Sequence, residues 1–158
     1  MLDSKVMHKR KYSSFLFLTI LIFQCFFINK ASADHLSIAL NYKIAEKSSI
    51  IIEGYDRKFY FEEKEFPLFT MNIEANKGSK SQDINLGSIP HKYIGIFAYI
   101  DLNNDGQFSL DFKGDPAEPY GFSLNPDNDF EDISYEDIVF DMNLLNEPVK
   151  ITLNLKID

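Results

Sequence analysis

The side chains best suited to chemistry are gathered in one Asp-rich segment, residues 101–111. Oxygen-bearing side chains stand there at alternate positions, and the candidate ligands are Asp101, Asn103, Asp105, Gln107 and Asp111. Calcium is a hard cation that takes roughly six to eight oxygen ligands, and a spacing of two in a tight loop directs them toward one centre. Gly106 permits the sharp turn that brings the Gln107 carbonyl inward. This pattern is the first half of an EF-hand loop and predicts a calcium site.

The second half of the segment departs from the EF-hand pattern. The bidentate glutamate that should end the loop is Phe112 here, and Asp111 stands one place early. No helical periodicity flanks the loop, so a calcium site would lie between strands. The alternative is that the Asn-Asp-Gly sequence at 104–106 forms a hairpin turn between strands at 93–100 and 108–112. Its Asp and Asn side chains would then bond their own backbone.

Candidate catalytic residues are few. Ser88 with His91, or Ser123 with an acidic neighbour, could be imagined as nucleophile and base. A working triad needs a geometry that spacing along the chain does not define. Neither the G-x-S-x-G nor the H-E-x-x-H motif occurs in the sequence. We therefore expect a protein without enzymatic activity, and a small periplasmic hydrolase is the least favoured alternative.

The first 33 residues have the order of a secretory signal peptide. Basic residues between Lys5 and Lys11 precede an apolar run at 15–28, and an Ala-Ser-Ala sequence stands at 31–33. The run is shorter than the roughly 20 residues that a spanning helix needs. We expect cleavage after Ala33 and a mature domain of residues 34–158, without a transmembrane segment, in the periplasm or secreted.

Charge and cysteine content limit the partners of this mature domain. The signal holds five of the 16 basic and one of the 24 acidic residues, so the remainder carries a net charge of −12. Nucleic acid and anionic membrane surfaces would repel it, whereas metal ions, amines and basic proteins would not. Cys25, the only cysteine, lies in the signal, so the domain has no disulfide, thiolate nucleophile or cysteine metal ligand. The expected partner is an envelope protein or a cationic ligand.

The periodicity of the mature chain is that of strands. Alternation with a period of two marks 36–44 and 149–157 as strands with one buried face. Segment 93–100 is apolar on both faces, which is typical of a strand in the centre of a sheet or sandwich. Shorter apolar or aromatic runs stand at 50–55, 59–61, 68–73, 84–86 and 108–112, with turn-rich stretches at 75–81 and 125–129. This spacing predicts an all-β sandwich or barrel of about seven strands.

One short helical signal precedes the last strand. Ser134 and Asp137 have the spacing of a capping box, and apolar residues follow them. The pattern predicts one or two helical turns near 134–139.

Several segments in the second half of the chain resemble the bacterial exported family called DUF2141. The resembling pieces are INLGSIP at 84–90, YIDLNNDG at 99–106, GDPAEPYGFS at 114–123 and SYED at 134–137. The chain departs from the family pattern at His91, Ile100, Asp115 and Pro119. The resemblance implies a small periplasmic or secreted Greek-key β-sandwich, immunoglobulin-like or transthyretin-like, and it implies no reaction.

Two functional hypotheses follow for an exported domain of this kind. In the first, the Asp-rich segment binds calcium and the metal stiffens the loop. In the second, the domain is a metal-independent protein-protein interaction module. It would then hold its partner through a sheet edge or through the aromatic residues at 59–61 and 66–69.

Overall fold

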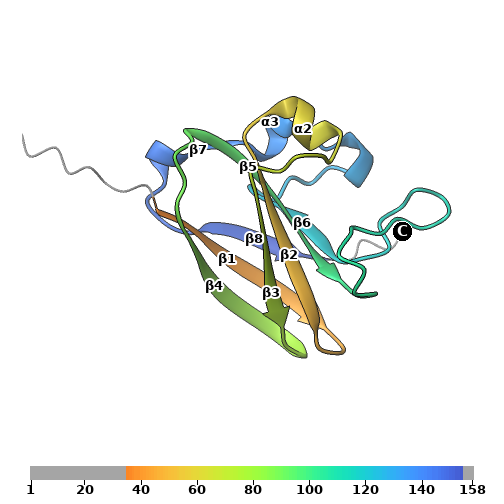
Figure 1. The fold of residues 1–158 in the computed structure, drawn as a ribbon. Helices are drawn as coiled ribbons and strands as arrows, with labels where there is room; N and C mark the ends of the chain where they lie inside the picture. The colour runs from red at the N-terminus through yellow and green to blue at the C-terminus, as the bar shows by residue number, and fades with distance from the viewer. Residues whose placement is uncertain (1–34, 155–158) are drawn as a thin grey trace, which may run out of the picture. The chain divides into compact units, whose positions relative to one another are not determined.

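The computed structural model describes residues 35–154, which form two packed β-sheets. The smaller sheet has the order β4-β1-β8, with the bounds β1 His35–Ile44, β4 Gly78–Ser88 and β8 Val149–Leu153. The larger has the order β3-β2-β5-β6, with the bounds β2 Ser48–Tyr55, β3 Phe69–Ala75, β5 Tyr93–Asp101 and β6 Tyr120–Phe122. A two-residue strand, β7 (Phe140–Asp141), pairs with the start of β5. Figure 1 shows the two sheets face to face, so the all-β sandwich prediction is confirmed.

The inner faces of the two sheets enclose an aliphatic core. In β1 the alternation predicted for 36–44 is confirmed, because Leu36, Ile38 and Leu40 are fully buried and the residues between them are not. The predicted alternation of the last strand is confirmed within β8, and residues 155–157 lie outside the described chain. β5 is buried on both faces, as predicted for a central strand, and its neighbours are β2 and β6.

The first and last strands lie next to each other. β1 pairs with β8 in parallel, with Ile38 opposite Val149, while β4 pairs with β1 on its other side in antiparallel orientation. On the far side of β8, Tyr120 and Asn154 exchange two backbone hydrogen bonds of 3.0 Å, which join the two sheets along this side. Gly121 permits this close approach, because a Cβ there would collide with the carbonyl oxygen of Thr152.

Short helices cover the outer face of the larger sheet at one end (Figure 1). They are α2 (Lys58–Glu62), α3 (Tyr135–Ile138) and the 3-10 turn η2 (Phe130–Asp132). A second 3-10 turn, η3 (Met142–Leu144), follows β7 and places Met142 in the core between the sheets. The helical turn predicted near 134–139 is α3. Its capping box forms as expected, since the Asp137 carboxylate accepts hydrogen bonds from the N–H and O–H of Ser134 at 2.9 and 2.6 Å.

Three predictions about individual segments were wrong. The predicted strand at 108–112 is a loop, and β5 instead pairs with β6, because Phe108 packs into an aromatic cluster and only Leu110 makes an isolated bridge. The run at 59–61 lies in α2 rather than in a strand, and it buries Phe61 while leaving Phe59 exposed. The turn predicted at 75–81 is shorter, because β4 already begins at Gly78.

The predicted signal peptide lies outside the described residues. Within the described chain, the helices are too short to cross a bilayer.

Candidate functional site

The Asp-rich segment forms a loop that folds onto its own backbone. Asp101 ends β5 and is only 3% exposed. Its two carboxylate oxygens accept hydrogen bonds from the amides of Asp105 at 3.2 Å and Gly106 at 2.9 Å. The Asn103 side chain accepts a second bond from the Asp105 amide, and Asp105 accepts one from the Gln107 amide at 2.8 Å. These are the local side-chain turns typical of Asp and Asn.

Glu118 holds both ends of this loop, a role that was not predicted from the sequence. It is 2% exposed, and its two oxygens accept hydrogen bonds from the amides of Leu102 at 2.8 Å and Ser109 at 3.1 Å. A buried carboxylate needs such donors, because an unsatisfied charge is expensive to bury. In the sequence Glu118 is one acid within an acidic stretch, and only the folded chain brings it beside the end of β5.

The five predicted calcium ligands do not lie together in one turn. Asp101, Asn103 and Asp105 lie together, but one oxygen of Asp111 accepts the amides of Lys113 at 2.8 Å and Asp115 at 3.0 Å in a turn of its own. The fifth, Gln107, lies on the wall of a groove described below. Among residues 35–154, no group of three or more His, Cys, Asp or Glu side chains is arranged to hold a metal ion.

A second hydrophobic cluster lies on the outer face of the larger sheet and is mainly aromatic. In β5 and β6, Phe97 stands opposite Phe122 and Tyr99 opposite Tyr120. Phe97 and Phe122 are stacked with ring centroids 4.9 Å apart. Phe108 is added from the Asp-rich loop, with its ring centroid 5.1 Å from that of Phe97. Further rings come from α2 and η2, so elements distant in sequence meet here.

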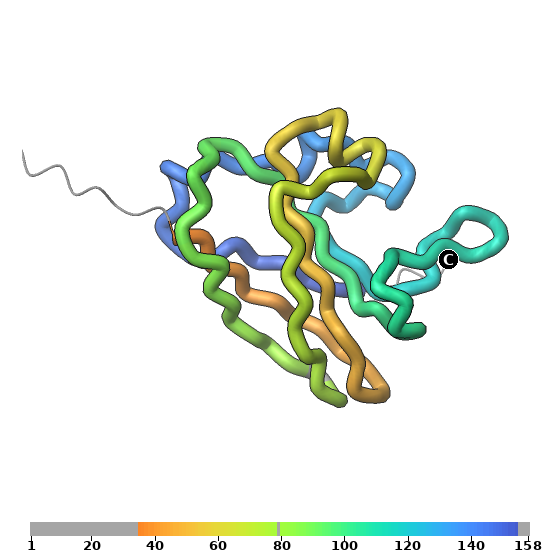
Figure 2. The backbone as a smooth tube through the Cα atoms, viewed as in Figure 1, coloured from red at the N-terminus to blue at the C-terminus, as the bar shows by residue number. Residues whose placement is uncertain are grey.

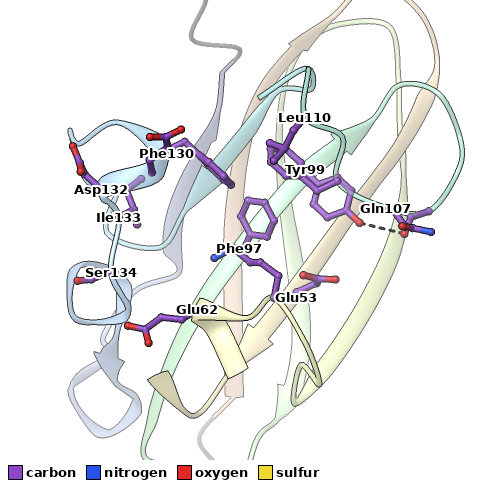
Figure 3. A pocket seen from close by; sticks show the side chains of 14 residues that line it. Glu53, Glu62, Phe97, Tyr99, Gln107, Leu110, Phe130, Asp132, Ile133 and Ser134 are labelled. Atoms are coloured by element: carbon purple, nitrogen blue, oxygen red, sulfur yellow. Dashed lines mark hydrogen bonds between the residues drawn. The ribbon is translucent and has the colours of Figure 1, made fainter. Parts of the chain in front are cut away.

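This cluster forms the floor and walls of a groove of about 650 Å³ (Figure 3). Its aromatic lining is Phe97, Tyr99, Phe108 and Phe130. Its charged lining is Glu53, Glu62, Lys64, Glu131 and Asp132. In Figure 3 the Phe97 ring lies between Tyr99 and Phe130, with the Glu53 and Glu62 carboxylates on the side of β2 and α2. Figure 2 shows the connection from β5 to β6, which carries the Asp-rich wall, projecting from the sandwich.

Two polar groups of the groove are perturbed by their surroundings. Glu53 lies on the outer face of β2 opposite Phe97, and desolvation raises the pKa of its carboxyl group. The Tyr55 hydroxyl donates a hydrogen bond of 2.7 Å to it. Burial also raises the pKa of Tyr99, and the negative field of Glu53, Asp101 and further carboxylates raises it more. Perturbed groups that converge in a groove lined by aromatic rings are typical of binding and active sites.

Lys64 is the cation of the groove lining. Its residue is exposed, but its ammonium nitrogen lies 3.5 Å from the Phe61 ring centroid and donates a 2.8 Å hydrogen bond to the Phe61 carbonyl. Desolvation lowers the pKa of this ammonium group to about 8, although Glu53 and Glu62 attract its positive charge. The backbone of Lys64 has a φ of 51°, a conformation that is uncommon for residues with a side chain.

The residues considered as catalytic have other contacts. Ser123 is fully buried, and its hydroxyl accepts the Ile96 amide at 2.9 Å and donates to the Ile138 carbonyl at 2.5 Å. These bonds connect β5 to the end of α3. The His91 Nδ1 atom lies 3.2 Å from the carboxylate of Asp56. Ser123 and His91 thus have structural partners.

The comparison with known families agrees with the resemblance. The family model described as "Uncharacterized protein conserved in bacteria (DUF2141)" matches residues 41–150, which is more than half of the chain. No curated protein and no solved structure matches the chain. The matched range includes the Asp-rich loop, Glu118 and the aromatic groove. The chain therefore belongs to the DUF2141 family.

Proposed function

We propose that the mature domain is a non-enzymatic binding module of the cell envelope that holds its ligand in the aromatic groove without a metal. The observation that carries this proposal is the groove itself. Its volume of about 650 Å³ lies within the roughly 300–1,000 Å³ of small-molecule sites. Its lining combines aromatic rings with charged and polar side chains.

The construction of the groove supports a binding role. The floor is formed by Phe97 and Tyr99 on the central strand of the sheet, where both residues are buried and their backbone is held on two sides. The walls come from α2, the Asp-rich loop and the segment around Phe130. A rigid floor with loop-borne walls lets binding residues vary while the scaffold keeps its geometry. The signal peptide predicted for residues 1–33 supports an envelope or extracellular location.

The test compares two phenylalanines of the same loop. Phe108 lines the groove, whereas Phe112 is 92% exposed and does not line it. Amide spectra of the mature domain, residues 34–158, would be recorded by NMR with benzylammonium, benzyl alcohol and benzoate as probes. We expect at least one probe to shift the signals of Phe97 and Tyr99. Phe108→Ala should weaken this binding and Phe112→Ala should retain it. Shifts that map elsewhere, or that Phe108→Ala leaves intact, would refute the groove as the site.

Calcium binding is a second candidate, and one specific observation favours it. The side chains of Asp101, Asn103 and Asp105 lie together in one loop, and within residues 35–154 neither of the two carboxylates forms an ion pair with a basic side chain. A bound cation would reduce the mutual repulsion of these carboxylates. Calcium would act on the wall of the groove, because residues 106–108 belong both to this loop and to the lining.

A further inference from the structure

We propose that the groove selects an organic ammonium compound, meaning a small amphipathic amine whose cation lies against the aromatic rings. This inference rests on the proposed binding function and names the chemical class of the ligand. Its basis is the combination of aromatic faces, an excess of carboxylates, and an ammonium group of the protein that already lies against this cluster.

The aromatic lining of the groove favours a cation. Phe97, Phe108 and Phe130 come from a strand, a loop and a 3-10 turn, and their ring centroids lie 5.1 to 6.3 Å apart. The face of an aromatic ring carries a negative quadrupole and attracts a cation within about 6 Å, most strongly where water is excluded. A neutral ligand would gain only the burial of apolar surface from the same rings.

The charges around the groove favour a cation as well. Four carboxylates line it, those of Glu53, Glu62, Glu131 and Asp132, against the ammonium group of Lys64. Lys58, outside the lining, pairs with Glu62 at 3.4 Å, so three carboxylates remain without this partner. The Tyr99 hydroxyl, which also lines the groove, lies in the negative field of Asp101 and Asp105 as well as that of Glu53. This negative field would repel an anionic ligand and attract a cationic one.

Lys64 shows that this cluster holds an ammonium group. Its nitrogen lies 3.5 Å from the ring centroid of Phe61, 5.9 Å from that of Phe97 and 6.0 Å from that of Phe130. Two of these rings, Phe97 and Phe130, also line the groove. Lys64 is therefore an internal competitor of a ligand cation, and it repels that cation as well. Removing its charge should increase the affinity for an amine.

The experiment uses three probes of similar size and different charge: benzylammonium, benzyl alcohol and benzoate. Each would be titrated into the mature domain at pH 7 and constant ionic strength, with the dissociation constant measured from NMR shifts. We expect benzylammonium to bind about tenfold more tightly than benzyl alcohol, an effect within the range of a partly desolvated cation–π contact. Benzoate should bind most weakly.

Matched variants assign the effect to the groove. Glu53→Gln should weaken benzylammonium several-fold and leave benzyl alcohol unchanged. Glu74→Gln is the control, because Glu74 lies on β3, pairs with Lys47 and does not line the groove. Lys64→Met should tighten benzylammonium binding several-fold.

The outcomes separate this inference from the proposed function. Equal binding of benzylammonium and benzyl alcohol in the groove would preserve the binding function and overturn the selection of an amine. Tighter binding of benzoate would also overturn it. Absence of binding by all three probes would contradict both proposals. The probe comparison uses the unmodified domain, so it does not depend on whether a variant folds.

Discussion

The two faces of β5 belong to two different hydrophobic clusters. On one face, Ile94, Ile96 and Ile100 are fully buried and belong to the aliphatic core between the sheets. On the other face, Phe97 and Tyr99 are nearly as well buried, but they belong to the aromatic cluster under short helices and a loop. Successive residues of a strand point to opposite faces, so one strand serves both clusters.

The difference between the clusters teaches where function can be accommodated. The inner core is built mainly from aliphatic side chains, which supply stability through burial, and its Tyr42 hydroxyl has hydrogen-bond partners in Gln82 and the Asn76 amide. The outer cluster includes Tyr55, Tyr99 and Tyr135, and it borders Glu53; burial raises the pKa values of all four groups. Polar groups placed in apolar surroundings cost stability, and such costs are typical of binding sites. The predictions below test this division between a stabilising face and a binding face.

The largest expected effect comes from truncating a residue on the inner face. Ile96→Ala should lower the free energy of unfolding by about 2–5 kcal/mol, because it leaves a cavity in a fully buried site. Phe108→Ala on the outer face should cost less, because Phe108 is only partly buried and borders the open groove. Urea unfolding of both variants measures the difference. A larger cost for Phe108→Ala would reverse the assigned roles of the two faces.

The next effect concerns the carboxylate that anchors the loop. Glu118→Ala removes both acceptors of the Leu102 and Ser109 amides and should cost about 1.5–3 kcal/mol, as expected for hydrogen bonds to a charged group. Glu118→Gln keeps one carbonyl acceptor and should cost less. Glu147→Ala, at an exposed position, is the control and should change stability by less than about 0.5 kcal/mol. Equal costs for Glu118→Ala and Glu147→Ala would mean that Glu118 does not stabilise the loop.

Calcium should have a smaller effect on the same loop. At 10 mM calcium and a dissociation constant of about 1 mM, binding to the folded state adds about 1.4 kcal/mol and raises the unfolding midpoint by roughly 5 °C. The rise should disappear in EDTA and in Asp105→Ala, and magnesium should not reproduce it. Thermal unfolding that is indifferent to calcium would leave the segment as a turn held by its own side chains.

The smallest expected effect is a pH dependence on the outer face. The pKa of Lys64 is about 8 in the folded protein and about 10.5 when unperturbed. Between these values the unfolded state binds more protons, so the free energy of unfolding should rise as the pH rises from about 8 to 10. Lys64→Met should flatten this rise, whereas Lys150→Met, at an exposed position, should not. Urea unfolding at several pH values measures how the free energy of unfolding changes with pH. Identical profiles for wild type and Lys64→Met would contradict the predicted role of Lys64.

The sequence predicted the inner core better than the outer face, and the reason is physical. The sequence signals for these strands are local patterns. They are the alternation in 36–44 and 149–153 and the run at 93–100, which is apolar on both faces, and each segment was confirmed as a strand. The groove has no local pattern, because its rings come from three distant segments. α2 was missed because one helical turn is too short to show a period of 3.6 residues. Glu118 acts only through a fold that returns it to the end of β5.

The parallel pairing of β1 with β8 has a consequence for how the chain is assembled. The two partners stand at opposite ends of the domain, so the smaller sheet cannot be completed until the last strand has been synthesised and has reached the first. Contacts between distant segments slow folding, because the entropy cost of closing the long intervening loop comes before the contact stabilises the fold. A nascent chain that lacks Val149 and the residues after it leaves β1 with one sheet neighbour instead of two. The native smaller sheet therefore becomes complete only once Val149–Leu153 has joined β1.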